Sequence, residues 1–272
     1  MRATVFGKAF GEAFSHLSHK VMVDLPMQRQ LNRAKKLALG PLKDYYARGI
    51  PDLSRDYEAA EYVALDIETT GLDAQKDILL SLGYVGLDSQ QIFLEQAVYN
   101  VVKPAPDHDN HDIGGMVIHQ LFDDILAQGE ALSEVMEAFL KAIYGKVLIA
   151  HHAKIERSFL SQICQKLYGA PLVVPYVDTL KLELRQRNRS LNPSPIREGD
   201  LRLDACRQRY HLPSYKAHHA LNDALAAGEL FLAQLQNLQH LQRSALQANP
   251  PKASGMRAAS FHPKASVMQL LY

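Results

Sequence analysis

The sequence is poor in cysteine and has no long apolar segment. Its only cysteines are Cys164 and Cys206, which excludes a disulfide framework and fits core packing in a reducing cytoplasm. No apolar run approaches the ~18 residues of a membrane span. The N-terminus also lacks the charged and then apolar pattern of a secretory signal. We therefore expect a cytoplasmic protein with no membrane contact.

Acidic residues are missing from one end of the chain. The net charge of +1 does not indicate a polyanionic partner for the whole chain. Residues 1–58, however, carry ten Lys and Arg against six Asp and Glu, and no acid follows Glu229. The central part is therefore net acidic and lies between two basic ends.

Three regions are predicted. Residues 1–58 have apolar side chains at helical spacing, interrupted by Pro and Gly, and predict a helical N-terminal extension. A helical hairpin packed on the main domain and a partner-binding or dimerising arm are both open for this extension. Residues 59–240 form the main domain, and residues 241–272, with Pro250-Pro251 and small side chains, predict a flexible basic tail.

The main domain predicts an α/β fold, a mixed sheet flanked by helices. Apolar and β-branched runs come first as a meander, and later strands alternate with helices. The expected strands are 62–67, 78–87, 92–102, 147–150 and 172–177. The expected helices are 131–144, a helix ending near 168, 204–210 and 220–238, and residues 186–199 are expected to be a loop.

Two carboxylates close the first strand. Asp66 and Glu68 are two residues apart, so on a strand their side chains leave from the same face. Two neighbouring acids repel each other and lose hydration, which is costly unless a cation lies between them. A divalent metal with oxygen ligands would satisfy the pair, and it needs further ligands.

Two later segments supply those ligands. Residues 149–160 follow a short strand and open a helix, with Glu156 in the first turns. Residues 218–224 also open a helix, with His218 before it and Asp223 one turn in. Four carboxylates suit two Mg²⁺ or Mn²⁺ ions roughly 3.5–4 Å apart that clamp a phosphodiester. A histidine that titrates near neutral pH suits the proton of an attacking water. Together these residues predict a metal-dependent phosphodiester hydrolase.

These motifs resemble the DEDDh family of 3′–5′ exonucleases, which has a ribonuclease-H-like fold. The resemblance rests on Asp-Ile-Glu-Thr-Thr-Gly, a His-X-Ala-X-X-acid segment and His-X-Ala-Leu-X-Asp, in that order, and covers residues 61–235. The family includes the proofreading epsilon subunit of bacterial DNA polymerase III, ribonuclease T and oligoribonuclease.

The resemblance implies a role for each site residue. Asp66 would bridge both metals, and Glu68 and Asp223 would hold the metal on the nucleophile side. Glu68 would also be catalytic, because it would lie near the attacking water. Glu156 would lie on the leaving-group side, and His218 would be the general base. The substrate-binding residues would be Thr69, Thr70 and Leu72 around the terminal nucleotide, together with His119.

The second motif departs from the family pattern. Where the family has His-Asn-Ala-X-Phe-Asp, this chain has His151-His152-Ala153-Lys154-Ile155-Glu156. Glu is one methylene longer than Asp, and a small shift at a metal site costs rate or alters metal preference. His152 in place of Asn adds an imidazole near the site.

Other polar groups are predicted to be structural. Asp178 follows a strand and precedes Thr179-Leu180, which is typical of a helix cap and not of a metal ligand. The run of His108, Asp109, His111 and Asp112 predicts a surface loop.

The leading hypothesis is an exonuclease that releases nucleoside 5′-monophosphates from single-stranded 3′ ends, with DNA favoured over RNA. The alternatives are an exoribonuclease of the same fold and a weakly active nucleic-acid-binding or polymerase-accessory module. Gln269-Leu270-Leu271-Tyr272 also resembles peptides that dock on a sliding clamp, although a terminus docked on its own domain is the commoner arrangement.

Overall fold

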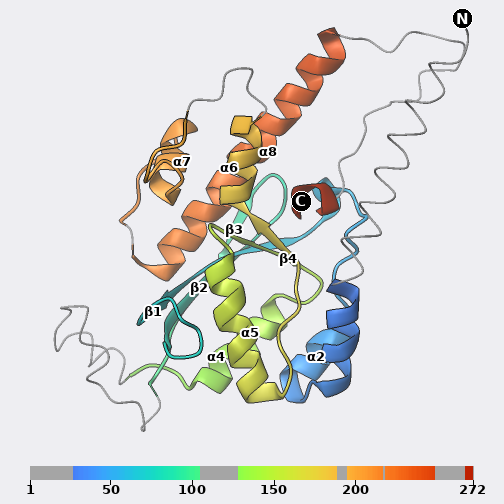
Figure 1. Ribbon diagram of the computed structural model, residues 1–272, viewed down its shortest axis with the longest axis vertical. Helices are drawn as coiled ribbons and strands as arrows, with labels where there is room; N and C mark the ends of the chain where they lie inside the picture. Colours follow the sequence, from blue (N-terminus) through green and yellow to red (C-terminus); the bar gives the residue numbers. More distant parts are fainter. Residues whose placement is uncertain (1–26, 105–127, 189–194, 217, 249–266, 272) are drawn as a thin grey trace, which may run out of the picture.

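A mixed sheet of five strands lies at the centre of the molecule (Figure 1). The computed structural model describes residues 27–104, 128–188, 195–216, 218–248 and 267–271. The strands are β1 (Tyr62–Thr69), β2 (Leu79–Leu87), β3 (Ile92–Val101), β4 (Val147–Ala150) and β5 (Tyr176–Asp178). Their order is β3-β2-β1-β4-β5, with β1, β2 and β3 antiparallel and with β4 and β5 parallel to β1.

Helices cover both faces of this sheet. The named helices are α2 (Gly40–Arg48), the short η1 (Tyr57–Ala59), α4 (Leu132–Ala142), α5 (Lys154–Tyr168), α6 (Thr179–Asn188), α7 (Leu203–Arg209), α8 (Ala220–Ala248) and α9 (Val267–Leu271). Val63 and Leu65 of β1 pack with α4 and α5, while Tyr62 and Ala64 pack with α8, as the two-residue period of a strand requires. The predicted mixed sheet flanked by helices is confirmed.

The N-terminal helices share the core under α4 and α5. A helix over residues 27–37 and α2 bury Leu31, Leu42 and Tyr45 in the same cluster as Phe139 of α4 and Phe159 of α5. The Leu39 amide donates to the Tyr168 carbonyl at 2.9 Å. These two helices are therefore part of the main domain's core, and the residues before 27 lie outside the described part.

Two boundaries differ from the sequence-based expectation. The predicted strand over residues 172–177 is β5, which is shorter and begins at Tyr176. Upstream of β5, the Val173 amide donates to the Tyr46 hydroxyl at 2.9 Å, so it is not available to pair with a neighbouring strand. The expected loop over residues 186–199 begins later, because α6 continues to Asn188.

The C-terminal region is more ordered than predicted. Helix α8 passes residue 240 and ends at Ala248, because its last turns contain good helix formers and no Pro or Gly before Pro250. Helix α9 replaces part of the expected flexible tail. Val267 is buried, Leu270 is only 4 % exposed, and the Leu270 carbonyl accepts from the Arg185 guanidinium at 2.6 Å. Of the residues proposed for a sliding clamp, Leu270 therefore packs on the protein's own domain, and Tyr272 lies outside the described residues.

A membrane-spanning role also finds no candidate helix. Among the residues with described placement, every helix is either too short or too polar to cross a bilayer.

Candidate active site

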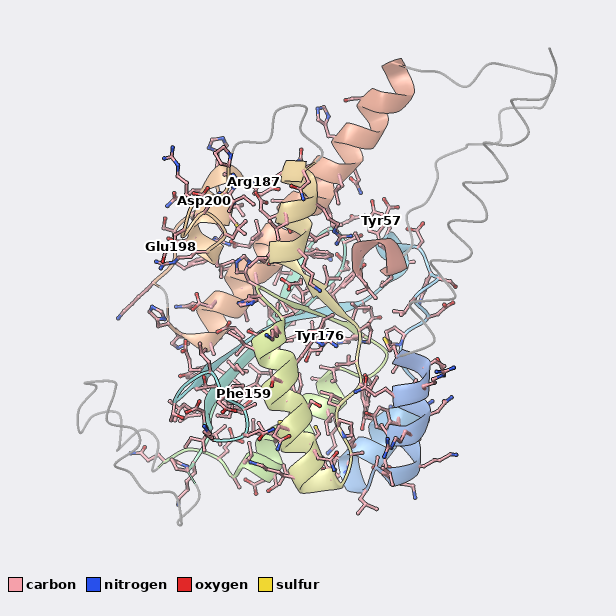
Figure 2. All side chains as sticks on the ribbon, in the orientation of Figure 1. Tyr57, Phe159, Tyr176, Arg187, Glu198 and Asp200 are labelled. Atoms are coloured by element: carbon pink, nitrogen blue, oxygen red, sulfur yellow. The ribbon has the colours of Figure 1, made fainter. Side chains whose placement is uncertain are left out.

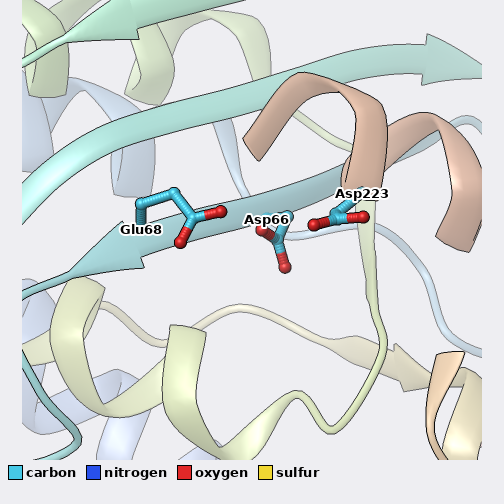
Figure 3. Close-up of side chains that lie close together, drawn as sticks. All are labelled: Asp66, Glu68 and Asp223. Carbon is cyan, nitrogen blue, oxygen red and sulfur yellow. The ribbon is translucent and has the colours of Figure 1, made fainter. Parts of the chain in front are cut away.

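Three carboxylates meet where β1 ends and α8 begins (Figure 3). Asp66 and Glu68 lie on β1 and Asp223 lies in the first turn of α8. One oxygen from each lies within 4.8 Å of the others, and this is the one such group found in the described residues. The structure therefore brings together three of the four predicted metal ligands.

Burial and mutual repulsion disfavour the charged forms of these acids. The pKa of Asp66 is raised well above its usual value by burial and then by the carboxylates of Glu156, Asp223 and Glu68. Burial and Asp223 raise the pKa of Glu68 as well, while His218 opposes the rise. A cation bound among them would offset this repulsion, and hard carboxylate oxygens suit Mg²⁺ or Mn²⁺.

Glu156 lies behind this group and has an unused oxygen. It is 4 % exposed, its Oε2 atom has no hydrogen-bond partner, and it is the strongest charged neighbour of Asp66. Burial raises the pKa of Glu156 to about 8, and Asp178 acts in the same direction. Its oxygens fall outside the 4.8 Å group, so the structure places the fourth predicted ligand beside the other three without joining it to them.

His218 lies at the entrance to α8 in a left-handed backbone conformation, with φ of 65°. Its amide donates to Asp223 Oδ2 at 2.9 Å, which ties the loop to the first turn of the helix. The side chain is exposed and lines the same cleft as Asp66 and Asp223. The predicted base is thus beside the predicted metal ligands.

The neighbouring histidines have different surroundings. His151 Nδ1 lies 2.8 Å from Thr179 Oγ1 and its Nε2 lies 2.7 Å from the Leu201 carbonyl, so both ring nitrogens are used inside the protein. Burial is the largest cause that lowers the pKa of His151. His152 is exposed, and its amide donates to Asp178 Oδ1. Asp178 also accepts from the Leu180 amide, which confirms its predicted role as a cap of α6.

The predicted substrate-binding residues follow directly from β1. The Thr69 hydroxyl donates to the Gly71 carbonyl at 2.6 Å, and Thr70 Oγ1 bonds to Asp77 within the β1–β2 loop. Leu72 is 77 % exposed and offers a free apolar surface. His119 and the run from His108 to Asp112 lie outside the described residues.

A cleft of about 670 Å³ opens beside the acidic group. One wall carries Asp66, His218 and Asp223, and the other is formed by α7 and residues 212–215. Its volume is typical of a small-ligand site, about 300–1,000 Å³.

Comparison with known proteins places this site in a family. Residues 63–231, more than half of the chain, match the family described as RNase_T, exonuclease. The chain is a member of this exonuclease family. The match begins at β1 and ends within α8, so it contains the three clustered acids, Glu156 and His218.

The PolC-type polymerases that are similar to this exonuclease domain are much longer proteins. It is 29% identical to a PolC-type DNA polymerase III from Thermotoga petrophila over 187 residues, 67% of this chain and 12% of the polymerase. Its fold is similar to the nuclease domain of 3′hExo bound to rAMP, with a TM-score of 0.52, 14% identity and coverage of 67% and 95%. It is also similar to E. coli exonuclease I in complex with a dA16 oligonucleotide, with a TM-score of 0.51, 13% identity and coverage of 68% and 43%.

One structural requirement of this exonuclease site was not found from the sequence. Gly83 of β2 pairs with Asp66, and a Cβ there would lie 2.2 Å from the Leu221 amide nitrogen and 2.3 Å from the Ala220 carbonyl carbon. Only glycine lets the start of α8 approach the sheet so closely. A glycine inside a predicted strand is the signal that could have found it.

A second such feature supports the histidine loop of the exonuclease. The rings of Tyr99 on β3 and His219 stack with centroids 4.3 Å apart. His219 directly follows His218, so the stack holds the residue next to the predicted base against the sheet. Nothing in the sequence brings residues 99 and 219 together.

Proposed function

We propose that this chain removes nucleoside 5′-monophosphates from the 3′ end of single-stranded nucleic acid. The observation that carries the proposal is the group of Asp66, Glu68 and Asp223, whose oxygens lie within 4.8 Å of one another beside His218 in an open cleft. The buried, unpartnered oxygen of Glu156 next to Asp66 supports it.

The donor set fits two divalent cations, Mg²⁺ or Mn²⁺. Asp66 would contact both, Glu68 and Asp223 would hold one, and Glu156 would hold the other. Bound there, such ions acidify water and stabilise negative charge on phosphate oxygens. Glu156 has to bring its free oxygen forward to join the group, and the extra methylene of Glu over Asp provides that reach.

His218 is proposed to take the proton of the attacking water at an imidazole nitrogen. The bond between its amide and Asp223 positions the loop, and the exposed ring can exchange the proton with solvent. Thr69 and Thr70 hold the β1–β2 loop in shape through internal hydrogen bonds. Leu72 then provides an apolar contact for the terminal base.

DNA is the proposed substrate, with RNA as the second candidate. The PolC-type relative is named as a DNA polymerase, and exonuclease I was solved with a DNA oligonucleotide. The 3′hExo nuclease domain was solved with rAMP, which keeps RNA in consideration. Strands that differ only in one 3′-terminal 2′-hydroxyl separate the two, because this group alone distinguishes RNA from DNA at the site.

The proposed biological setting is the cytoplasm. The likeness to PolC-type polymerases suggests work alongside a DNA polymerase, and the buried free thiols of Cys164 and Cys206 fit a reducing cytoplasm. Binding of a sliding clamp by residues 269–272 would require α9 to leave its site, so we do not include it.

The test is the rate at which the full chain shortens a 5′-labelled strand with Mg²⁺ or Mn²⁺. Asp66→Asn keeps the side-chain shape and removes a metal ligand, so release of mononucleotides should fall by at least about a thousandfold. Glu134→Gln, an exposed acid on α4, is the control and should retain full activity. Equal rates for Asp66→Asn and the parent chain would refute the site. Strand binding without any metal-dependent shortening would favour the accessory-module alternative.

A further inference from the structure

A second cavity adjoins the catalytic cleft. It has a volume of about 530 Å³ and shares His151, Arg202 and Leu203 with the larger cleft. Its remaining wall includes His152 at the start of α5, together with Arg197 and Glu198. The two cavities therefore form one path that begins at Asp66 and continues past Arg202.

The segment that lines this path is strongly basic. Residues 181–216 contain nine Lys and Arg against four Asp and Glu, although the chain as a whole is nearly neutral. The β1–β2 loop, which also follows directly from the acidic group, carries Asp73 and Asp77 against Lys76. Positive charge is therefore concentrated on the α6–α7 side of the site.

Several arginines of this segment are already neutralised. Arg187 lies 3.6 Å from Asp200, Arg207 lies 2.7 Å from Glu229, and Arg209 lies 2.7 Å from Glu183. Figure 2 labels Arg187, near the end of α6, and Asp200 and Glu198, which precede α7.

Arg197 and Arg202 differ from these arginines. Both side chains are exposed, and within the described ranges neither guanidinium has an ion pair or a hydrogen bond. Both line the second cavity, and Arg202 lines the cleft as well. Among the described arginines of this segment, Arg197 and Arg202 are thus unpaired and face the path.

We propose that the substrate strand leaves the catalytic cleft through this second cavity, where Arg202 and Arg197 bind the phosphates that precede the terminal nucleotide. The inference rests on the proposed function and adds the direction of the strand. A guanidinium has a planar set of donors that matches phosphate oxygens, and phosphate contacts fix the position of a strand without reading its sequence. Glu198 on the same wall repels the strand and keeps it near the arginines.

The experiment compares a substrate that fills only the terminal site with one that also needs the path. The first is the 4-nitrophenyl ester of thymidine 5′-monophosphate, and the second is a dT8 strand. The variants of the full chain are Arg197→Gln/Arg202→Gln, the charge-preserving Arg202→Lys, and Lys166→Gln as a control on the exposed side of α5.

The double variant should lose kcat/KM on dT8 by at least about tenfold more than on the ester, mainly through KM. The salt dependence of its dT8 affinity should fall by about 0.7 in log–log slope for each lost phosphate contact. Arg202→Lys should keep most of the slope, and Lys166→Gln should match the parent chain on both substrates.

Failure of this inference and failure of the proposed function give different results. If the parent chain hydrolyses neither substrate with Mn²⁺, the proposed function is wrong. If it hydrolyses both and the double variant shows an unchanged slope and KM on dT8, the strand takes another path. Equal losses on the ester and on dT8 would also overturn the inference, because the arginines would then act on the terminal nucleotide. Thermal unfolding of each variant shows whether it is folded, and Arg202→Gln alone replaces the double variant if that variant is unfolded.

Discussion

Replacement of Gly83 by alanine tests whether the approach of α8 to the sheet creates the proposed metal site. The added Cβ would lie 2.2 Å from the Leu221 amide nitrogen, whereas ordinary contacts begin near 3.4 Å. Both clashing groups are backbone, so the start of α8 must move by about 1 Å. Asp223 lies two residues beyond Leu221 and would move away from Asp66 with it. A displacement of about 1 Å in a catalytic group costs on the order of a hundredfold in rate.

Gly86→Ala on the same strand is the matched control. Its Cβ would meet Gln96 Oε1 at 2.0 Å, which is the end of a flexible side chain on β3 and can turn away. We expect Gly83→Ala to lose about a hundredfold in kcat and about 1–3 kcal/mol in free energy of unfolding, and to bind Mn²⁺ more weakly. Strand-shortening rates, urea unfolding and Mn²⁺ titration measure the three effects. A Gly83→Ala protein with the rate and Mn²⁺ affinity of Gly86→Ala would refute this account of the site.

Three further predictions follow from the contacts described above. In EDTA, the free energy of unfolding should fall by about 2–4 kcal/mol as pH rises from about 4.5 to about 8, because the folded state holds a proton on Glu156 that the unfolded chain releases. In thermal melts, Glu156→Gln should reduce this dependence of stability on pH. An unchanged dependence in that variant would contradict the raised pKa of Glu156. Tyr99→Ala should lower kcat by about two- to tenfold, because it removes the ring that stacks on His219. Tyr99→Leu keeps the bulk of the side chain without the ring, so it separates the effect of stacking from that of volume. Equal rates for both variants and the parent chain would exclude a positioning role. Leu270→Ala should cost about 2–3 kcal/mol in urea unfolding because its side chain is buried against the domain, and a cost near zero would return α9 to the predicted mobile tail.

The parts of the site that were predictable from sequence are those fixed by local periodicity. Asp66 and Glu68 must share a face because a strand repeats every two residues, and Asp223 falls in the first turn of α8 because the helix begins at Ala220. The order of the three motifs then indicated which segments meet. The same local patterns identified the sheet and most of its helices.

The parts that were missed depend on distant contacts. The role of Gly83 follows from the register of β1 on β2 and from the place where α8 crosses them. Neither can be predicted from the sequence of residues 79–87 alone. Part of the expected strand is absent because the Val173 amide donates to a hydroxyl on Tyr46, which is 127 residues away. The position of α9 depends on Arg55 and Arg185, and the distance from Glu156 to the other acids depends on how α5 lies against the sheet.

The Asp223 carboxylate accepts a hydrogen bond from the His218 amide, and it would also be a ligand of the proposed cation. If a bound ion reorients that carboxylate, the stability of the loop conformation changes. If substrate orders the loop, the affinity for the ion changes. Thermodynamic reciprocity requires the two effects to be equal in size. Cation binding and the order of the His218 loop would then be coupled through the one Asp223 carboxylate.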